Sequence, residues 1–275
     1  MAQTALKHLP ARLPVLAEAE TWHKGLERKS ARELALMRQA GRINALALAE
    51  MAKHVRPGIT TRQLDAIAER VIRQAGAVPA FKGYPGPYPF PANTTISVNE
   101  QLVHGLPGPR VIREGDVVSL DCGTKYEGYY ADAAVSVGVG QLHPLAKKII
   151  EVAEAALYVG LEQLRPGKRT GDVSAAMREF VEGQGFRLVR QFTSHGVGRH
   201  MHEDPAIAND EKAGTGVVLR PGLTIALEPM VLVSTRETRT LPDGWTIVSA
   251  DGAVTAHFEH TVAITEGEPE ILTKA

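Results

Sequence analysis

The chain has 275 residues, 44% of them hydrophobic, and its 31 acidic residues balance 31 basic ones. This length and composition can bury a sizeable core, as one large domain or two smaller ones, and the net charge of zero gives no electrostatic reason to expect a nucleic acid or membrane partner. The single cysteine, Cys122, excludes an internal disulfide and a cysteine-rich zinc site, so we expect it to serve only in packing.

The segment from Met1 to Lys29 differs from the rest of the chain. It mixes prolines, charges and scattered leucines, and it lacks the continuous apolar stretch of a secretory signal. No later segment approaches the ~20 apolar residues of a membrane span. We therefore expect residues 1–29 to be a loosely packed extension, residues 30–275 to form a single domain, and the protein to be cytoplasmic.

The first helix is predicted to begin after Ser30, a suitable N-cap, because Glu33 three residues later completes a capping box. It is expected to run to His54. Its expected buried positions are Leu34, Met37, Ile43, Leu46 and Leu48. A second helix is predicted over residues 64–74, after an Arg-Pro-Gly break, and Gly76 closes it.

The same pair of helices recurs later in the chain. Helices are predicted over residues 144–164 and 173–183, again separated by Arg-Pro-Gly. The interval between the two Arg-Pro-Gly breaks, from Arg56 to Arg165, is the same as the interval between the closing glycines, Gly76 and Gly185. An internal duplication is the economical explanation, and it predicts two halves of similar structure.

A β-hairpin is predicted around residues 120–133, between the two helix pairs. With Tyr126 and Glu127 as its turn, Asp121 would lie directly opposite Asp132. Two like charges opposed in an apolar hairpin destabilise it unless a cation lies between them. The hairpin therefore indicates a metal site; the alternative is a register one residue different, with one carboxylate facing water.

The duplication predicts further carboxylates at the same site. The segment that ends at Asp121 resembles the segment that ends at Glu228, so the two carboxylates hold equivalent positions. A following strand of the second half supplies Glu259, as the hairpin supplies Asp132. If the halves pack about a pseudo-twofold axis, the four carboxylates converge.

Two loop motifs contain histidine. The stronger one places His195, His200 and His202 close together in sequence, beside glycines that permit close backbone approach. His195 and His202 are candidates for contact with a metal or a substrate, whereas His200 is expected to be an ordinary surface or core residue. The weaker motif contains His104, and no motif surrounds His257.

Several carboxylates with one imidazole form a donor set that Mn²⁺, Fe²⁺, Co²⁺ or Zn²⁺ accepts. Five such ligands with shared carboxylates suit two ions about 3.5 to 4 Å apart with a bridging water. A pair of this kind produces hydroxide near neutral pH and polarises a carbonyl group. Amide hydrolysis is therefore the expected class of reaction.

Together these motifs resemble those of the type I methionine aminopeptidases, a family with the pita-bread fold. The resemblance runs from about Ser30 to Ile271. The matching motifs are Ser97-Val-Asn-Glu-Gln-Leu-Val-His104-Gly, Leu120-Asp121, Asp132, His195-Gly-Val-Gly, His202, Glu228-Pro-Met and Glu259-His-Thr. The resemblance implies an α+β pita-bread fold: two pseudo-symmetric halves, each with antiparallel strands and a helix pair, and an active site between them.

The resemblance also implies a role for each matching residue. The expected metal ligands, for two divalent ions of cobalt, manganese, iron or zinc, are Asp121, Asp132, His195, Glu228 and Glu259. Glu228 would in addition carry a proton from the attacking water to the leaving amine. His104 and His202 would stabilise charge at the cleaved amide.

The implied reaction is removal of the initiator methionine from nascent chains whose second residue is small. The expected substrate-binding residues are His104, His202, Phe90, Met201 and Trp245. The chain departs from the family pattern at Val103 and Met201, where members often have a cysteine and an aromatic residue. Which of Tyr84, Tyr88 and Phe90 lines the methionine pocket is left open. A monomer is expected; the ribosome is a candidate partner without a supporting motif.

Three other kinds of protein could share some of these features. An Xaa-Pro aminopeptidase or prolidase would use nearly the same ligands, but such chains usually have a folded N-terminal domain, and only the short predicted extension precedes the core here. A type II methionine aminopeptidase carries a long insert before the fourth ligand, whereas the segment between His202 and Glu228 is too short to hold one. A metal-free pita-bread binding protein would have lost ligands that this chain keeps.

Overall fold

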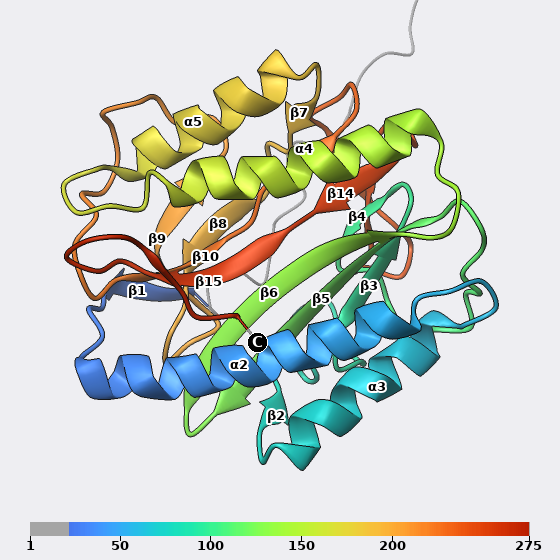
Figure 1. Ribbon diagram of the computed structural model, residues 1–275, viewed down its shortest axis with the longest axis horizontal. Helices are drawn as coiled ribbons and strands as arrows, with labels where there is room; N and C mark the ends of the chain where they lie inside the picture. Colours follow the sequence, from blue (N-terminus) through green and yellow to red (C-terminus); the bar gives the residue numbers. More distant parts are fainter. Residues whose placement is uncertain (1–21, 275) are drawn as a thin grey trace, which may run out of the picture.

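A computed structural model describes residues 22–274, and Figure 1 shows the arrangement of the elements. The helices of this part of the chain are α2 (Ala31–His54), α3 (Thr61–Gln74), α4 (Pro144–Leu161) and α5 (Thr170–Gly183). The strands of the first half are β1 (Trp22–Leu26), β2 (Val78–Pro79), β3 (Thr95–Val98), β4 (Gln101–Val103), β5 (Val117–Tyr126) and β6 (Tyr129–Gly138). Those of the second half are β7 (Arg187–Leu188), β8 (Thr193–Gly196), β9 (His202–Ala208), β10 (Thr224–Leu227), β11 (Met230–Leu232), β12 (Thr238–Thr240), β13 (Ile247–Ser249), β14 (Thr255–His257), β15 (Glu259–Ala263) and β16 (Glu270–Ile271).

Helix α2 begins as predicted, with Ser30 and Glu33 forming both hydrogen bonds of a capping box. The backbone and side chain of Ser30 both donate to the Glu33 carboxylate, which lowers its pKa to about 2. One prediction for this helix is wrong: Leu46 is 45% exposed. The buried stripe recurs at three- and four-residue spacing from Met37 to Met51, and Leu46 lies off that stripe.

The bounds of the other helices differ from the prediction by about one turn. Helix α3 starts at Thr61 rather than residue 64, because Thr60 and Gln63 form a second capping box, a signal present in the sequence. Helix α5 likewise starts at Thr170, and α4 ends at Leu161.

Strands β5 and β6 form the predicted hairpin around a Glu127-Gly128 turn. Both turn residues have a positive φ, 47° and 86°, which is the type I′ geometry that suits the twist of a two-residue hairpin loop. Tyr126 therefore pairs with Tyr129.

This turn shifts the register by two residues from the predicted one. Asp121 pairs with Ala134 and Asp132 with Gly123, so the prediction of directly opposed carboxylates is wrong. Side chains alternate between the two faces of a sheet with a period of two residues. A shift of two residues consequently leaves both carboxylates on one face, as diagonal neighbours.

The strands form one large sheet and two three-stranded sheets. The large sheet has the order β1-β9-β8-β10-β15-β6-β5-β2, with β16 beside β15 and β3 beside β5. Strands of the two halves are joined where β15 pairs with β6, through Glu259 opposite Ala134 and His260 opposite Ala133. The two halves therefore share one continuous sheet, and their boundary lies at its centre.

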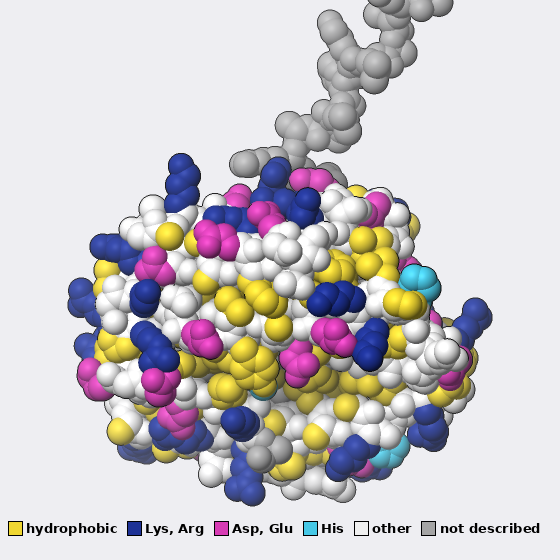
Figure 2. Space-filling model, turned by 45° about the horizontal axis from the view of Figure 1, so that its top comes forward, with side chains coloured by type: hydrophobic (Ala, Val, Ile, Leu, Met, Phe, Trp, Pro, Cys, Tyr) yellow, Lys and Arg dark blue, Asp and Glu magenta, His cyan; other side chains and the backbone are white. Residues whose placement is uncertain are grey.

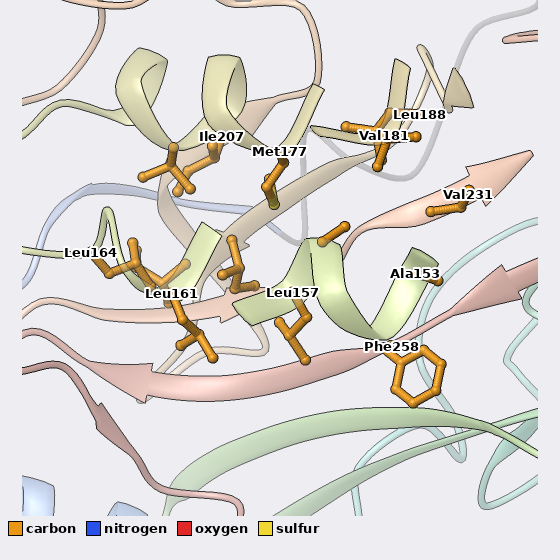
Figure 3. Close-up of a cluster of buried hydrophobic side chains, with 14 of the residues drawn as sticks. Ala153, Leu157, Leu161, Leu164, Met177, Val181, Leu188, Ile207, Val231 and Phe258 are labelled. Carbon is orange, nitrogen blue, oxygen red and sulfur yellow. The ribbon is translucent and has the colours of Figure 1, made fainter. Parts of the chain in front are cut away.

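Each half covers its part of the sheet with its own helix pair. In Figure 1, α2 lies along β5 and β6, α3 lies beside α2 and near β2 and β3, and α4 and α5 lie over the strands of the second half. The first-half core includes Cys122, which is fully buried and packs among apolar residues as expected. Figure 3 shows the second-half core, to which α4, α5, the neighbouring strands and their connecting segments contribute Ala153, Leu157, Leu161, Leu164, Met177, Val181, Leu188, Ile207, Val231 and Phe258.

Equivalent contacts support the pseudo-symmetry of the halves. The segment before α3 forms an isolated bridge between Thr60 and Val111, and the segment before α5 forms one between Arg169 and Val218. The two helices are followed by glycines at φ 76° and 85°, at positions 76 and 185. The glycines, and Thr60 with Arg169, repeat at the interval that separates the two Arg-Pro-Gly breaks in the sequence.

Residues 22–29, part of the predicted extension, contact the second half. Strand β1 runs parallel to β9, with Trp22 paired to His202. Lys29 forms a buried ion pair with Glu203, and its backbone N–H donates to the Gly222 carbonyl at 2.7 Å. The rest of that predicted extension, residues 1–21, lies outside the described residues, and the boundary at residue 29 stays a prediction.

The surface carries charges of both signs. On the face shown in Figure 2, acidic and basic side chains are interspersed, in keeping with the zero net charge. Between residues 22 and 274 no helix has both the length and the apolar composition needed to cross a bilayer.

Candidate metal centre and active site

The five predicted metal ligands lie on neighbouring strands at the centre of the large sheet. In the order β8-β10-β15-β6-β5, the strands carry His195, Glu228 directly after β10, Glu259, Asp132 and Asp121. The two carboxylates of the first half and the three ligands of the second half thus meet across the β15–β6 junction. The duplicated strands bring the side chains together, as the sequence predicts.

Three of these side chains form a cluster with the geometry of a metal site. One ligand atom each from Asp132, His195 and Glu259 lies within 4.8 Å of the other two. The three residues are only 5%, 3% and 2% exposed. Asp132 is further fixed by Thr261, whose hydroxyl accepts from the Asp132 N–H and donates to its carbonyl, both at 2.8 Å.

The hydrogen bond of His195 determines which ring nitrogen is free. Its Nδ1 lies 2.8 Å from the Gly196 carbonyl oxygen, which can only accept, so Nδ1 carries the proton. Nε2 lies 3.4 Å from the Glu228 carboxylate. A backbone carbonyl that holds Nδ1–H in this way is the usual partner of a metal-binding imidazole, and it leaves a lone pair on Nε2 for an ion.

The carboxylates at this site lack the partners that buried charges need. Asp121 Oδ1, Asp132 Oδ1 and Glu259 Oε1 are buried without a hydrogen bond, although the second oxygen of Asp121 accepts from Thr95 at 3.0 Å. Burying several unpaired negative charges is costly unless a cation or protons neutralise them. The donor set and its unsatisfied oxygens therefore fit divalent metal ions.

The pKa values of the metal-free site also reflect how unfavourable it is to bury these unpaired carboxylates. Burial raises the pKa of Asp121 to about 6 and that of Glu228 to about 7. Burial, and then the charges of the other carboxylates, raise the pKa values of Asp132 and Glu259 well above the ordinary range. In the metal-free protein, protons would have to take the place of the cations.

This cost gives a prediction for the pH dependence of stability. A carboxyl whose pKa is higher in the folded state adds stability at low pH, which is lost as pH rises through the folded pKa. For Asp121 and Glu228 that window runs from their ordinary pKa values of 3.8 and 4.5 to about 6 and 7. We expect the metal-free protein to lose stability across this window relative to an Asp121→Asn, Glu228→Gln double variant.

The measurement is urea unfolding of both proteins after treatment with a chelator, at several pH values. Addition of Mn²⁺ or Co²⁺ should stabilise the wild-type protein, because an ion that binds only the folded state shifts the unfolding equilibrium. A stability difference between the two proteins that is independent of pH would contradict the pKa shifts.

His202 lies beside the metal cluster. Its ring centre is 4.3 Å from that of His195, and it also contacts Trp22 and Tyr84. Burial, and then the neighbouring His195, lower the pKa of His202 well below its usual value. A neutral imidazole at this place can donate one hydrogen bond and accept another.

His104 follows β4 in the first half of the chain, yet it lies near the histidines of the second half. Burial, and then the charge of His257, lower its pKa to about 4. Its φ of 59° is uncommon for a residue other than glycine, and its ring meets Phe192 edge-on at 5.8 Å. Such backbone strain is concentrated at functional sites.

Aromatic contacts join two of the predicted pocket residues. Phe90 lies edge-on to Trp245, with ring centres 5.0 Å apart, and Tyr88 contacts the same tryptophan at 6.2 Å. Tyr84 instead places its hydroxyl 2.5 Å from His202. Met201 is 5% exposed and immediately precedes that histidine.

His257, which no sequence motif surrounds, also faces the site. It is 2% exposed, and its Nε2 has no hydrogen bond and lies 3.5 Å from Glu228. Ser136 holds its backbone at both the N–H and the carbonyl, each at 2.9 Å. The available signal was alternation, because His257 precedes Glu259 by two positions and such residues of an extended chain share a face.

His200, which the sequence separated from the other two histidines of its motif, lies away from the cluster. Its side chain is 49% exposed and stacks on His23, with ring centres 4.4 Å apart. Its backbone N–H donates to Glu203 at 3.0 Å.

The sequence and the fold of this chain are similar to those of known peptidases. The model of metallopeptidase family M24 matches residues 35–266. Methionine aminopeptidase 1 of Bacillus subtilis is 48% identical over 246 residues, which are 90% of this chain and 98% of the relative. The crystal structure of methionine aminopeptidase from Thermotoga maritima is 43% identical, with a TM-score of 0.89, over 91% of this chain and all of that one. Prolidase from Pyrococcus furiosus is more distant, with 25% identity, a TM-score of 0.74, and coverage of 90% of this chain but 65% of its own.

Proposed function

Because this chain belongs to metallopeptidase family M24, we propose that it is a metal-dependent aminopeptidase that removes the N-terminal methionine of nascent polypeptides. The observation that carries the proposal is the buried cluster of Asp132, His195 and Glu259, in a chain 48% identical to a methionine aminopeptidase. The pita-bread fold predicted from the resemblance is the fold of the solved methionine aminopeptidases that this chain matches. The enzyme is thus a hydrolase that acts at the chain end.

Two divalent ions, cobalt, manganese, iron or zinc, are the proposed cofactors. Their proposed ligands, which would hold the ions, are Asp121, Asp132, His195, Glu228 and Glu259. Bound ions would supply an acidified water molecule and polarise the scissile carbonyl. The unsatisfied oxygens and the free Nε2 of His195 support this assignment.

Side chains of this protein would transfer the proton of the attacking water and stabilise the charge that develops on the cleaved amide. Glu228, whose carboxylate lies 3.4 Å from His195 in the metal cluster, would take a proton from water and give it to the leaving amine. His202 and His104, both neutral because burial lowers their pKa values, would donate hydrogen bonds to the amide as charge develops.

The proposed methionine pocket combines Phe90, Met201 and Trp245, apolar groups that suit a thioether side chain. We also propose that the second residue of the substrate is small and that the protein is a monomer. Action on nascent chains would place the protein in the cytoplasm, with the ribosome as a candidate partner; nucleic acid and membrane binding are not proposed.

A proline-directed peptidase is the main competitor. Prolidases share the fold with this chain, but the solved example is matched over only 65% of its length, whereas the methionine aminopeptidases are matched almost completely. The metal-free alternative has less support, because the relatives with high identity carry the name methionine aminopeptidase. The type II alternative is disfavoured by the short segment between His202 and Glu228.

The activity can be tested with three peptides, Met-Ala-Ser, Met-Lys-Ser and Ala-Pro-Ser, incubated with apo-protein that has been titrated separately with Mn²⁺, Co²⁺, Fe²⁺ or Zn²⁺. We expect metal-dependent release of methionine from the first peptide alone. Cleavage of the third instead would move the protein to the proline-directed branch. Metal binding without cleavage of any peptide would favour the alternative that the protein is a pita-bread binding protein without peptidase activity.

A further inference from the structure

Two aromatic residues from distant parts of the chain hold the ring of His202. The indole of Trp22 stacks on it, with ring centres 5.6 Å apart and an interplanar angle of 22°. The hydroxyl oxygen of Tyr84 lies 2.5 Å from His202 Nδ1. One contact restrains the plane of the imidazole and the other occupies one of its two nitrogens.

We infer that Tyr84 and Trp22 are positioning residues that keep His202 in a single orientation, as the tautomer with its proton on Nε2. The inference deepens the proposed function and rests on it, since it concerns the histidine proposed to donate a hydrogen bond to the cleaved amide. Such a donor needs its proton on the nitrogen that faces the substrate.

The chemistry of the Tyr84 contact selects this tautomer. A phenol O–H is more acidic than the N–H of a neutral imidazole, so the hydrogen bond is stronger when the phenol donates and Nδ1 accepts. A neutral imidazole has one N–H proton, carried by one of its two ring nitrogens. With Nδ1 accepting, that proton is on Nε2, which is the assignment opposite to the one that Gly196 enforces on His195.

Trp22 is itself fixed, so it can fix a neighbour. Its Nε1 donates to one oxygen of Asp204 at 2.9 Å, and the Gly25 N–H donates to the other oxygen at 2.9 Å. At the far end of the segment, Lys29 forms its buried ion pair with Glu203. The strand that carries Trp22 is therefore tied to both residues that follow His202.

Trp22 lies outside the part of the chain that the family model matches, residues 35–266. Residues 22–29 of the predicted extension thus provide a side chain to the active site through the parallel pairing of β1 with β9. This pairing sets Trp22 directly beside His202 in register, which explains how a segment remote in sequence reaches the site.

The direct test is ¹⁵N NMR of protein labelled in histidine, both metal-free and loaded with diamagnetic Zn²⁺. The signals of His202, identified by their loss in His202→Ala, should show a protonated Nε2 and an unprotonated Nδ1. In Tyr84→Phe the two nitrogens should become averaged between tautomers. A protonated Nδ1 in the wild type, or an unchanged Nε2–H signal in Tyr84→Phe, would overturn the inference.

Kinetics supply a second readout. Tyr84→Phe and Trp22→Ala should each lower kcat about five- to tenfold while KM changes by less than about twofold, and Trp22→Phe should restore most of the loss because it keeps a stacked ring. In a His202→Ala background neither substitution should cost anything further, because both act through that ring. An equal loss in both backgrounds would indicate a merely structural role and overturn the inference.

Two matched controls separate positioning from general damage. His23→Ala alters the neighbouring residue of β1, which stacks on His200, and Tyr158→Phe removes an exposed hydroxyl on α4. Both should keep wild-type kcat. If His202→Ala itself has full activity, the proposed role of His202 fails, whereas the NMR result still decides the tautomer.

Discussion

His195→Ala is expected to reduce metal-dependent turnover of a Met-Ala-Ser peptide by more than about 100-fold at low metal concentration. The imidazole is the one nitrogen ligand among the five proposed ligands, and because Gly196 holds its Nδ1, Nε2 is the atom left to bind an ion. Removing even an outer partner of a metal ligand typically costs about 10- to 100-fold in affinity or activity, and a direct ligand should cost more.

The measurement pairs turnover with bound metal, determined by elemental analysis after dialysis. His200→Ala is the matched control, because it removes the same side chain from the same motif at an exposed position away from the cluster. We expect it to keep its metal and its turnover. Normal turnover of His195→Ala at low metal concentration would remove His195 from the ligand set.

A second consequence concerns folding without metal. The His195 variant still buries Asp132 and Glu259, whose pKa values burial and mutual repulsion raise. Its metal-free form should unfold at a somewhat lower urea concentration than metal-free wild-type protein, because a buried ring is lost, and added Mn²⁺ should stabilise it much less. The comparison separates loss of a ligand from loss of the fold.

The sequence predicted the centre of the site because its signals are local and repeated. Asp121 and Glu228 stand at equivalent positions of two similar segments, and each half adds one more carboxylate on the next paired strand. Such a pattern survives an error in register. The predicted hairpin was two residues out, yet an even shift keeps both aspartates on one face.

The features that the sequence did not reveal depend on tertiary contacts. The parallel pairing of β1 with β9, which sets Trp22 on His202, joins segments remote in sequence and leaves no periodic pattern in either of them. His257 could have been found by alternation from Glu259, but a lone histidine without a motif is usually a core residue. The contact between the Tyr84 hydroxyl and His202 could be predicted only from the path of the loop that carries Tyr84.

The turn between β5 and β6 shows why local geometry matters for such predictions. Glu127 adopts a positive φ of 47°, which is unfavourable for a residue with a Cβ atom, and Gly128 adopts one at little cost. Placing the turn at Tyr126 and Glu127 would have required this conformation of a bulky aromatic residue. The glycine therefore decides the position of the turn, and with it the register of both aspartates.

His202→Ala is expected to lower kcat by about 100-fold or more while metal content stays unchanged, since removal of one donor to a developing oxyanion typically has that effect. His202 contacts His195, yet it lies outside the group of Asp132, His195 and Glu259 whose ligand atoms converge. Its contribution should appear in kcat rather than in KM, because a hydrogen bond that strengthens as charge develops stabilises the transition state more than the bound peptide.

His202→Gln is the informative companion, because a side-chain amide retains an N–H donor at similar reach. It should recover part of kcat, whereas a residue needed only for packing would tolerate both substitutions or neither. Steady-state kinetics with a Met-Ala-Ser peptide and elemental analysis of the purified variants make the comparison. Loss of metal from His202→Ala would place this ring among the ligands instead, and the five-ligand assignment would then have to be revised.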